Sequence, residues 1–304
     1  MTAFFFPGQG SQSLKMMAGF DDMPVVKKTF EEASDALNIN LWTMINGDDA
    51  AIINETVNTQ PLMLASGVAV FRAYRELGGE TPAVAAGHSL GEYTALTVSG
   101  SLKFADAVRL VRLRAELMQN AVPHGAGAMA AILGLEDDTV RQICADAAQG
   151  EIVEAVNFNS PAQVVIAGQL SAVNRAMEAA KNAGAKRALS LPVSVPSHCS
   201  LMKPAAEQLA QALQETDFRQ PEIKIIHNAD VTSYDNTEKI KDALVRQLYS
   251  PVRWTETVQQ IILSGCLKAA ECGTGKVLAG LAKRIDKNMS CTAFTDSNAV
   301  RNFI

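Results

Sequence analysis

The stretch VAAGHSLGEYTALTVSG, residues 84–100, places a serine between two glycines where an apolar run meets a helical pattern. Residues 83–86 are typical of a short buried strand, and a helical pattern begins at residue 92. In a G-x-S-x-G turn of this kind the glycines let strand and helix approach, while the serine occupies the strained tip. The stretch therefore favours an α/β fold and makes Ser89 a candidate nucleophile. An ordinary glycine–serine turn is the alternative.

The rest of the chain supports an α/β class, because apolar strand-like runs alternate with amphipathic helical patterns. There is no internal repeat and no low-complexity segment. Strands are expected at residues 3–6, 83–86, 222–229 and 266–272, and helices at 60–77, 92–98, 106–120 and 275–285.

Between these segments the order changes to strand, helix, strand, strand, helix, strand. The six elements are expected at residues 128–135, 137–149, 152–159, 163–168, 171–185 and 186–194. This is the order of a ferredoxin-like unit, and Ser171 is expected to cap its second helix. We predict a small ferredoxin-like subdomain at 125–193, inserted into a larger one made of 1–124 and 194–304.

Composition excludes several classes of protein. The 304 residues are 48% hydrophobic, enough for a large core, and the net charge of −5 without a Lys/Arg block disfavours nucleic acid as a partner. The five cysteines form no CxxC pair and are expected to be free thiols, not a disulfide framework or a metal site. Neither a signal peptide nor a membrane span is recognisable. These features predict a soluble, cytoplasmic protein.

A serine nucleophile needs a base, and the chain has four histidines. His198 follows a strand end and precedes a helix, where a catalytic loop residue would lie, although position alone does not decide its role. His88 is expected to point away from the serine and to be structural. His124 is expected in an exposed loop, and His227 in a strand as a core or edge residue.

Arg114 is the most informative charged residue. On the expected helix 106–120 it lies in the middle of the apolar face. A buried guanidinium is costly unless it is paired. Two interpretations remain open from the residues alone. Arg114 forms an internal salt bridge or extends its charged end to solvent, or it binds the carboxylate of a substrate in a bidentate manner.

Two glycine-rich segments fail as nucleotide-binding loops. After the first strand, the third glycine of a G-x-G-x-x-G motif is replaced by Ser13. The second segment is CGTGKV, residues 272–277. Ala270, two residues before it, stands where a phosphate loop begins with glycine, and Val277 follows the lysine in place of Ser or Thr. We expect the first loop to direct backbone N–H groups at the serine turn instead.

Seven segments in order resemble the malonyl-CoA:acyl carrier protein transacylases along nearly the whole chain. They are FPGQGSQ (6–12), GHSLGEY (87–93), RLRAELMQ (112–119), NSPAQVVIAG (159–168), PSHCSLM (196–202), QLYSPVRW (247–254) and GTGKVL (273–278). The resemblance implies an α/β-hydrolase-like large subdomain carrying a ferredoxin-like small one. Thr274 departs from the family, which usually has proline there.

The resemblance also implies site residues. Ser89 corresponds to the nucleophile and His198 to the general base. Gln9 and Leu90 correspond to the residues whose backbone N–H groups form the oxyanion hole. Gln247 corresponds to the residue whose backbone carbonyl orients the histidine, so no acidic third member is expected.

By the same resemblance, Arg114 binds the malonyl carboxylate. The implied reaction is two-step transfer of malonyl from malonyl-CoA to holo acyl carrier protein for fatty acid synthesis, by a monomer without a metal or cofactor. Lys186 and Arg187, at the end of the small subdomain and close in sequence to His198, are our candidates for docking the acidic carrier protein. An ordinary solvated pair is the alternative. A serine esterase or thioesterase, a trans-acting acyltransferase of a polyketide pathway, and a catalytically silent carrier-binding subunit remain alternatives.

Overall fold

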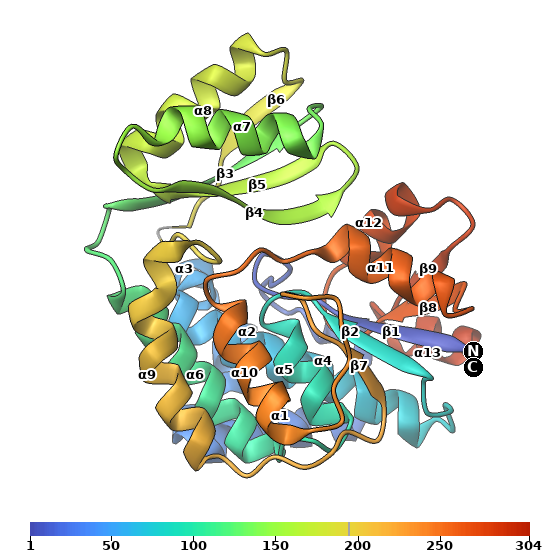
Figure 1. Ribbon diagram of the computed structural model, residues 1–304. Coiled ribbons are helices and arrows are strands. Elements are labelled where there is room, and N and C mark those ends of the chain that lie inside the picture. The colour runs from blue at the N-terminus through green and yellow to red at the C-terminus, as the bar shows by residue number, and fades with distance from the viewer. Residues whose placement is uncertain (194) are drawn as a thin grey trace.

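The computed structural model describes residues 1–193 and 195–304, and it contains two separate sheets (Figure 1). The larger sheet has five strands in the order β7-β2-β1-β8-β9, and every neighbouring pair is parallel. Its strands are β1 (Thr2–Phe6), β2 (Val84–Gly87), β7 (Lys224–Ile226), β8 (Lys268–Glu271) and β9 (Ser290–Ala293). The parallel sheet confirms the predicted α/β class.

Both faces of this sheet are covered, as a parallel sheet requires. Along β1, Phe4 and Phe6 pack into one hydrophobic cluster, while Ala3 and Phe5 pack into another on the opposite face. The surrounding helices are α1 (Pro24–Leu37), α2 (Leu41–Asn46), α3 (Ala50–Asn54), α4 (Thr56–Glu76), α5 (Gly91–Val98), α6 (Phe104–Asn120), α9 (Lys203–Glu215), α10 (Thr237–Gln247), α11 (Trp254–Leu263), α12 (Val277–Ile285) and α13 (Ser297–Phe303).

Helix α4 begins four residues before its expected start at residue 60, so Pro61 lies inside it. Proline has no N–H group to donate to the carbonyl four residues earlier, which would leave the Val57 carbonyl without that partner. Arg112 of α6 donates to this carbonyl over 3.1 Å. The early start is therefore stabilised by a residue of another helix.

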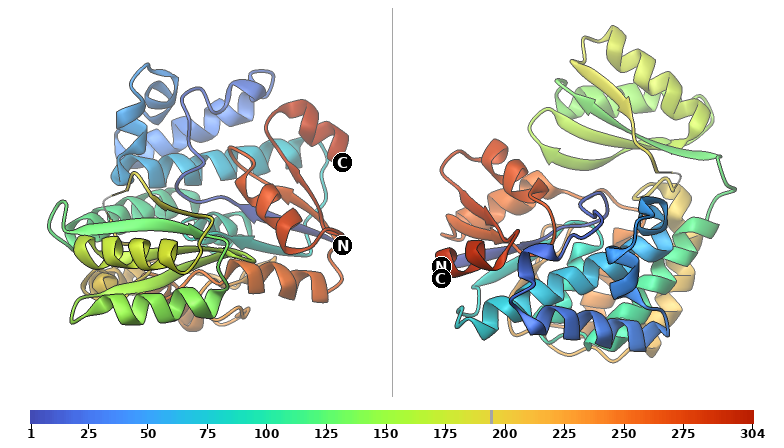
Figure 2. Two further views of the ribbon diagram at one scale, coloured as in Figure 1. Left: turned by 90° about the horizontal axis from the view of Figure 1, so that it is seen from above. Right: turned by 180° about the vertical axis from the view of Figure 1, so that it is seen from behind.

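The smaller sheet has four strands in the order β4-β5-β3-β6, with antiparallel pairing throughout. Its elements are β3 (Gly127–Leu133), α7 (Asp137–Ala148), β4 (Val153–Ser160), β5 (Gln163–Gln169), α8 (Leu170–Asn182) and β6 (Arg187–Ser190). This confirms the ferredoxin-like prediction. Figure 2 shows α7 and α8 together on the face turned away from the large sheet. The other face packs against Cys199 and Leu201.

The predicted cap of α8 was wrong. Its N-cap residue is Gln169, and Ser171 is already inside the helix, where its hydroxyl donates to Glu151 over 2.5 Å. The reason is that β5 runs directly into α8, so the helix begins before the serine. The limits of the two subdomains stay a prediction, and residue 194, the predicted start of the second large segment, lies outside the described residues.

Residues 1–193 and 195–304 show no sign of disulfides, membrane-spanning helices or metal sites. The five cysteines are free thiols, as expected. No described helix combines the length and hydrophobicity needed to cross a bilayer. Within the same residues, no group of three or more His, Cys, Asp or Glu side chains converges in a way that would hold a metal ion.

Candidate active site

The turn between β2 and α5 has the strained geometry that the sequence predicted. Ser89 adopts a φ of 53°, in the left-handed region. A Cβ on Gly87 would lie 1.8 Å from the carbonyl carbon of Gly91, and a Cβ on Gly91 would lie 2.0 Å from the carbonyl oxygen of Phe6. Both positions therefore require glycine, and their close contact holds the serine at the tip of the turn.

Ser89 and His198, 109 residues apart, are hydrogen-bonded, with 2.7 Å between Oγ and Nε2. The other ring nitrogen, Nδ1, lies 2.8 Å from the backbone carbonyl of Gln247. A carbonyl only accepts, so the hydrogen is assigned to Nδ1 and the Nε2 lone pair faces the serine hydroxyl. Burial, followed by the positive charge of Arg114, lowers the pKa of His198 to about 3. The imidazole is therefore neutral at physiological pH.

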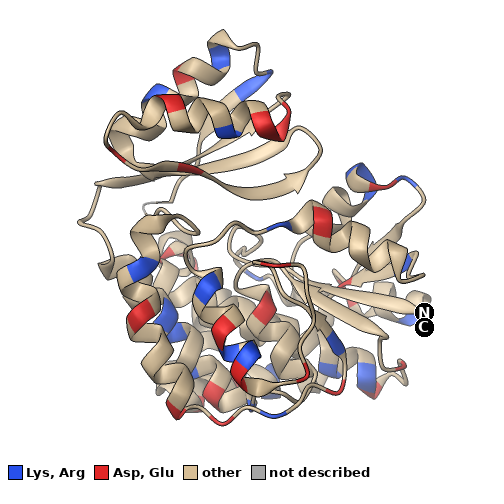
Figure 3. Ribbon diagram, viewed as in Figure 1, with Lys and Arg blue, Asp and Glu red and all other residues tan. Residues whose placement is uncertain are grey.

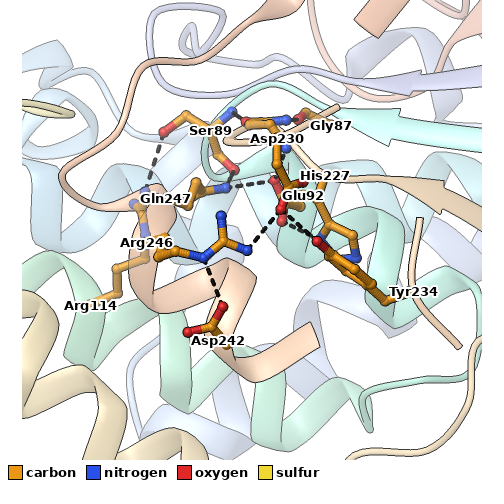
Figure 4. Close-up of polar contacts among 11 residues, drawn as sticks. Gly87, Ser89, Glu92, Arg114, His227, Asp230, Tyr234, Asp242, Arg246 and Gln247 are labelled. Carbon is orange, nitrogen blue, oxygen red and sulfur yellow. Dashed lines mark hydrogen bonds and ion pairs between the residues drawn. The ribbon is translucent and has the colours of Figure 1, made fainter. Parts of the chain in front are cut away.

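Arg114 projects from α6 directly beneath Ser89 and is only 1% exposed (Figure 4). Its Nη1 donates to Gln60 Oε1 over 2.9 Å, and its Nη2 donates to Gln247 Oε1 over 3.0 Å and to Ser89 Oγ over 3.2 Å. The guanidinium also lies over the Tyr93 ring. Its hydrogen-bond partners in the described chain are all neutral. The buried arginine therefore neither forms the internal salt bridge nor extends to solvent.

Gln9 and Leu90 are among the residues that line the same cleft as Ser89. Leu90 immediately precedes α5, and the loop carrying Gln9 lies so close to the turn that a Cβ on Gly8 would be 2.5 Å from the His88 carbonyl oxygen. Within residues 1–193 and 195–304, neither of their backbone N–H groups donates a hydrogen bond. Unpaired backbone N–H groups of this kind are what an oxyanion hole requires.

The cleft runs between the two sheets. The large part contributes Ser89, Arg114 and Gln9, and the small part contributes Met129 from β3 and Asn157 from β4. The lining is mixed, with apolar side chains around a few polar groups, as in typical small-molecule sites. A bound acyl chain would therefore touch both parts of the molecule.

The other histidines lie apart from the serine hydroxyl. His88 lines the cleft, but its Nε2 is bonded to Asn159 Oδ1 over 2.8 Å, and burial lowers its pKa. His124 is exposed, as expected. His227 is buried, as expected for a core position, with its Nδ1 2.7 Å from Glu92 Oε1. It lies one residue beyond β7 and not within a strand, because the strand is shorter than predicted.

The segment 272–277, which the sequence excludes as a phosphate loop, leads into a helix N-terminus that binds a carboxylate of the protein. The N-terminus of α12 donates two backbone N–H groups, those of Leu278 and Ala279, to the buried Glu271 carboxylate over 3.1 and 2.8 Å. That carboxylate fills the position that a phosphate would take. Thr274, in the same segment, donates to the Ser11 carbonyl over 3.4 Å, so the departure from proline adds a contact to the loop after β1.

Lys186 and Arg187 are both exposed, at the beginning of edge strand β6. They are not among the residues that line the cleft at Ser89. Neither of them forms an ion pair with any residue in the described part of the chain. In the view of Figure 3, Lys and Arg residues are interspersed with Asp and Glu residues along the helices.

Sequence reasoning missed several residues that hold the site. Asn228 fixes the turn, because its Oδ1 accepts from the Ser89 N–H and its Nδ2 donates to the Gly87 carbonyl, both over 2.7 Å. Gln60 and the side chain of Gln247 hold Arg114. The only signal for Gln60 was a polar residue directly before the apolar run at 61–65.

A serine and a histidine hydrogen-bonded at a strand–helix turn, beside a parallel sheet and an inserted ferredoxin-like unit, define a serine-dependent acyltransferase. The acyl transferase domain family matches residues 3–273. The chain is 51% identical to the malonyl CoA-acyl carrier protein transacylase of Escherichia coli strain K12, over 98% of this chain and 97% of that one. It belongs to the malonyl CoA-acyl carrier protein transacylase family.

Solved structures agree with this assignment. An acyl carrier protein S-malonyltransferase from Vibrio cholerae is 54% identical, with a TM-score of 0.97, over 100% of this chain and 99% of that one. A malonyl-transacylase solved in complex with a type II PKS acyl-carrier protein is 51% identical, also with a TM-score of 0.97, over 98% and 97% of the two chains. The resemblance inferred from the seven segments is confirmed.

Proposed function

We propose that the protein transfers a malonyl group from malonyl-CoA to the phosphopantetheine thiol of acyl carrier protein, supplying extender units for fatty acid synthesis. The names of its relatives support this substrate pair. The observation that carries the proposal is the position of Arg114, buried 3.2 Å from Ser89 Oγ with neutral partners only. A malonyl ester on Ser89 would present its free carboxylate to this guanidinium.

The proposed chemistry is covalent. His198 Nε2 takes the Ser89 proton while Oγ attacks the thioester carbonyl carbon, and the oxyanion is stabilised by the N–H groups of Gln9 and Leu90. The C–S bond breaks, and CoA leaves with the proton from His198. The carrier-protein thiol then gives its proton to His198 and attacks the malonyl ester, and its C–S bond forms as the bond to Oγ breaks. The proton returns to Ser89.

Intact-mass measurement after brief incubation with malonyl-CoA tests the proposal. The wild-type protein should gain the mass of a malonyl group and release CoA in a burst followed by slow turnover. Ser89→Ala should gain no mass. Free turnover without a burst would instead indicate an esterase or thioesterase, and a malonyl adduct on Ser89→Ala would show that another residue is the nucleophile.

A second candidate function is supply of malonyl to a polyketide carrier protein. It is supported by the similar malonyl-transacylase solved with a type II PKS acyl-carrier protein. Comparing kcat/KM for fatty acid and polyketide carrier proteins at equal malonyl-CoA distinguishes the two, since the physiological partner should be the preferred acceptor. We also propose that the enzyme is a cytoplasmic monomer, which sedimentation and cell fractionation would test.

A further inference from the structure

Beneath Ser89 lies a fully buried carboxylate, Glu92 in the first turn of α5, which the proposed chemistry does not use. Its Oε1 lies 2.7 Å from His227 Nδ1, and its Oε2 accepts from the Asn228 N–H over 2.9 Å and from Gln247 Nε2 over 3.0 Å (Figure 4). Both oxygens of the buried Glu92 carboxylate therefore have polar partners.

Glu92, together with the Ser89 carbonyl, fixes which way the Gln247 amide points. The amide nitrogen lies 2.9 Å from the Ser89 carbonyl oxygen and 3.0 Å from Glu92 Oε2. Both of these groups are acceptors, so the amide must place its nitrogen there and its oxygen on the opposite side. That oxygen accepts from Arg114 Nη2 over 3.0 Å. Without an acceptor at residue 92, the amide would lose one of the two hydrogen bonds that hold its nitrogen on this side.

The amide also keeps two buried opposite charges apart. Glu92 and Arg114 are 0% and 1% exposed, and the Gln247 side chain bonds to both of them. A carboxylate in direct contact with Arg114 would occupy the edge of the guanidinium that is needed for an incoming carboxylate. Through an intervening amide, Glu92 still offsets the cost of the buried cation, because charges interact strongly in a poorly polarisable interior.

We propose that Glu92 is a positioning and specificity-determining residue. Through the Gln247 amide, Glu92 holds the Arg114 guanidinium beside Ser89. Its negative charge balances that of Arg114, but it does not occupy the hydrogen-bonding edge of the guanidinium. The site thereby selects acyl groups that carry a free carboxylate over those that do not. This inference rests on the proposed malonyl transfer.

Glu92→Gln, measured with malonyl-CoA and with acetyl-CoA, tests the inference. The substitution keeps the shape but removes the negative charge. The Gln247 amide keeps its contacts with the Ser89 carbonyl and Arg114 but loses the carboxylate acceptor that helps to hold it. We expect the malonyl-to-acetyl ratio of kcat/KM to fall by about 10- to 100-fold, the scale of a misplaced binding group. Most of the change should be a higher KM for malonyl-CoA, with little change for acetyl-CoA. An unchanged ratio would overturn the inference.

His227→Gln provides the matched control, because His227 is bonded to the same carboxylate on the oxygen that does not hold Gln247. It should lower the melting temperature and leave the malonyl-to-acetyl ratio within about twofold of wild type. A fall in the ratio as large as that of Glu92→Gln would mean that the cluster acts only through packing. If Glu92→Gln does not fold, Gln247→Met interrupts the same path and should lower the ratio equally. An unchanged ratio there would overturn the inference.

A double-mutant cycle distinguishes failure of this inference from failure of the proposed function. If Glu92 acts through Arg114, adding Glu92→Gln to Arg114→Ala should not lower the malonyl-to-acetyl ratio further. Effects that multiply would overturn the inference. If Arg114→Ala alone lowers both rates equally, the proposed role of Arg114 fails. If it lowers only malonyl transfer while Glu92→Gln changes nothing, the role of Glu92 alone is wrong.

Discussion

Arg246 on helix α10 and the nearby Arg114 differ in their partners (Figure 4). One is paired with carboxylates and the other is held by neutral groups. Arg246 pairs directly with Asp230 and Asp242, each over 2.7 Å, and its side chain is 30% exposed. The next residue, Gln247, holds the buried Arg114 through a neutral amide oxygen. Arg246 thus carries a guanidinium that pairs with two carboxylates, whereas its neighbour Gln247 holds a guanidinium that contacts no carboxylate among the described residues.

The difference indicates what each arginine is for. The carboxylates around Arg246 satisfy it within the fold, so it stabilises the packing of α10 against the Asp230 segment. Burial lowers the pKa of Arg114, yet a guanidinium keeps its proton in proteins. Its positive charge thus remains available to a ligand, at a cost that the fold offsets with neutral oxygens and a carboxylate one amide away.

Gln247→Glu should have the largest effect, because it gives Arg114 a carboxylate partner and so removes the difference between Arg114 and Arg246. The backbone carbonyl that bonds His198 would remain, so the serine–histidine pair should persist. We expect malonyl transfer to fall about 100-fold, because the pairing site is already occupied, which corresponds to about 3 kcal/mol. Acetyl transfer should be much less affected. Equal losses for the two substrates would show that the substitution damages the site as a whole.

The two arginines should also differ in their effect on His198. Its pKa is lowered from 6.5 first by burial and then by Arg114, so kcat/KM should show no loss of activity near pH 6.5. Arg114→Ala, assayed with acetyl-CoA, should raise this pKa and move the loss on the acid side to higher pH, whereas Arg246→Ala should leave it in place. A titration near pH 6.5 in the wild-type enzyme would contradict the assigned environment.

The lowered pKa of His198 should also make the stability of the folded protein depend on pH. Between pH 6.5 and about 3 the unfolded chain binds a proton at His198 that the folded chain does not. The folded protein should therefore lose stability as the pH falls through this window, at up to about 1.4 kcal/mol per pH unit from this one group.

A third kind of positive charge is the exposed pair Lys186 and Arg187, which we propose steers the acidic carrier protein to the cleft. Reversing both charges should raise KM for carrier protein by about threefold to tenfold, as expected for the loss of electrostatic steering. KM for malonyl-CoA should stay constant. An equal rise for both substrates would reject docking.

The smallest effect is expected for Arg246→Ala. Its ion pairs are partly exposed, at 30% for the arginine and 23% for Asp230, so their loss should cost only about 1 kcal/mol. That corresponds to a fall in melting temperature of about 2 °C. The malonyl-to-acetyl ratio should not change, and a change would mean that Arg114 and Arg246 are not independent.

Sequence patterns predicted correctly those elements whose structure depends on residues close together in the chain. The glycine-flanked Ser89 turn and the ferredoxin-like order were both confirmed, because each depends on spacing within a short segment. The start of α4 was not predicted, since a helix containing Pro61 requires a partner for Val57 that Arg112 supplies from 55 residues away.

The partners of the site were beyond the reach of sequence patterns. Helical periodicity placed Arg114 on a buried face, but its contacts with Gln60 and Gln247 join residues 54 and 133 positions apart. Glu92 looks like an ordinary acidic residue at a helix start, and only its contacts with residues 227, 228 and 247 show it to be buried. The resemblance to a known family, and not the pattern, indicated Gln9, Leu90 and the Gln247 carbonyl.

Arg114 contacts no carboxylate among the described residues, and this leaves its guanidinium able to bind the carboxylate of a substrate. The most direct test is the ratio of malonyl to acetyl transfer rates in the wild-type protein and in Arg114→Ala. Loss of a buried charge pair costs about 3–5 kcal/mol, so malonyl transfer should fall roughly a hundred- to several-thousandfold, at about 1.4 kcal/mol per tenfold. Acetyl transfer should change little or improve. If both rates fall equally, Arg114 supports the fold and does not select the substrate.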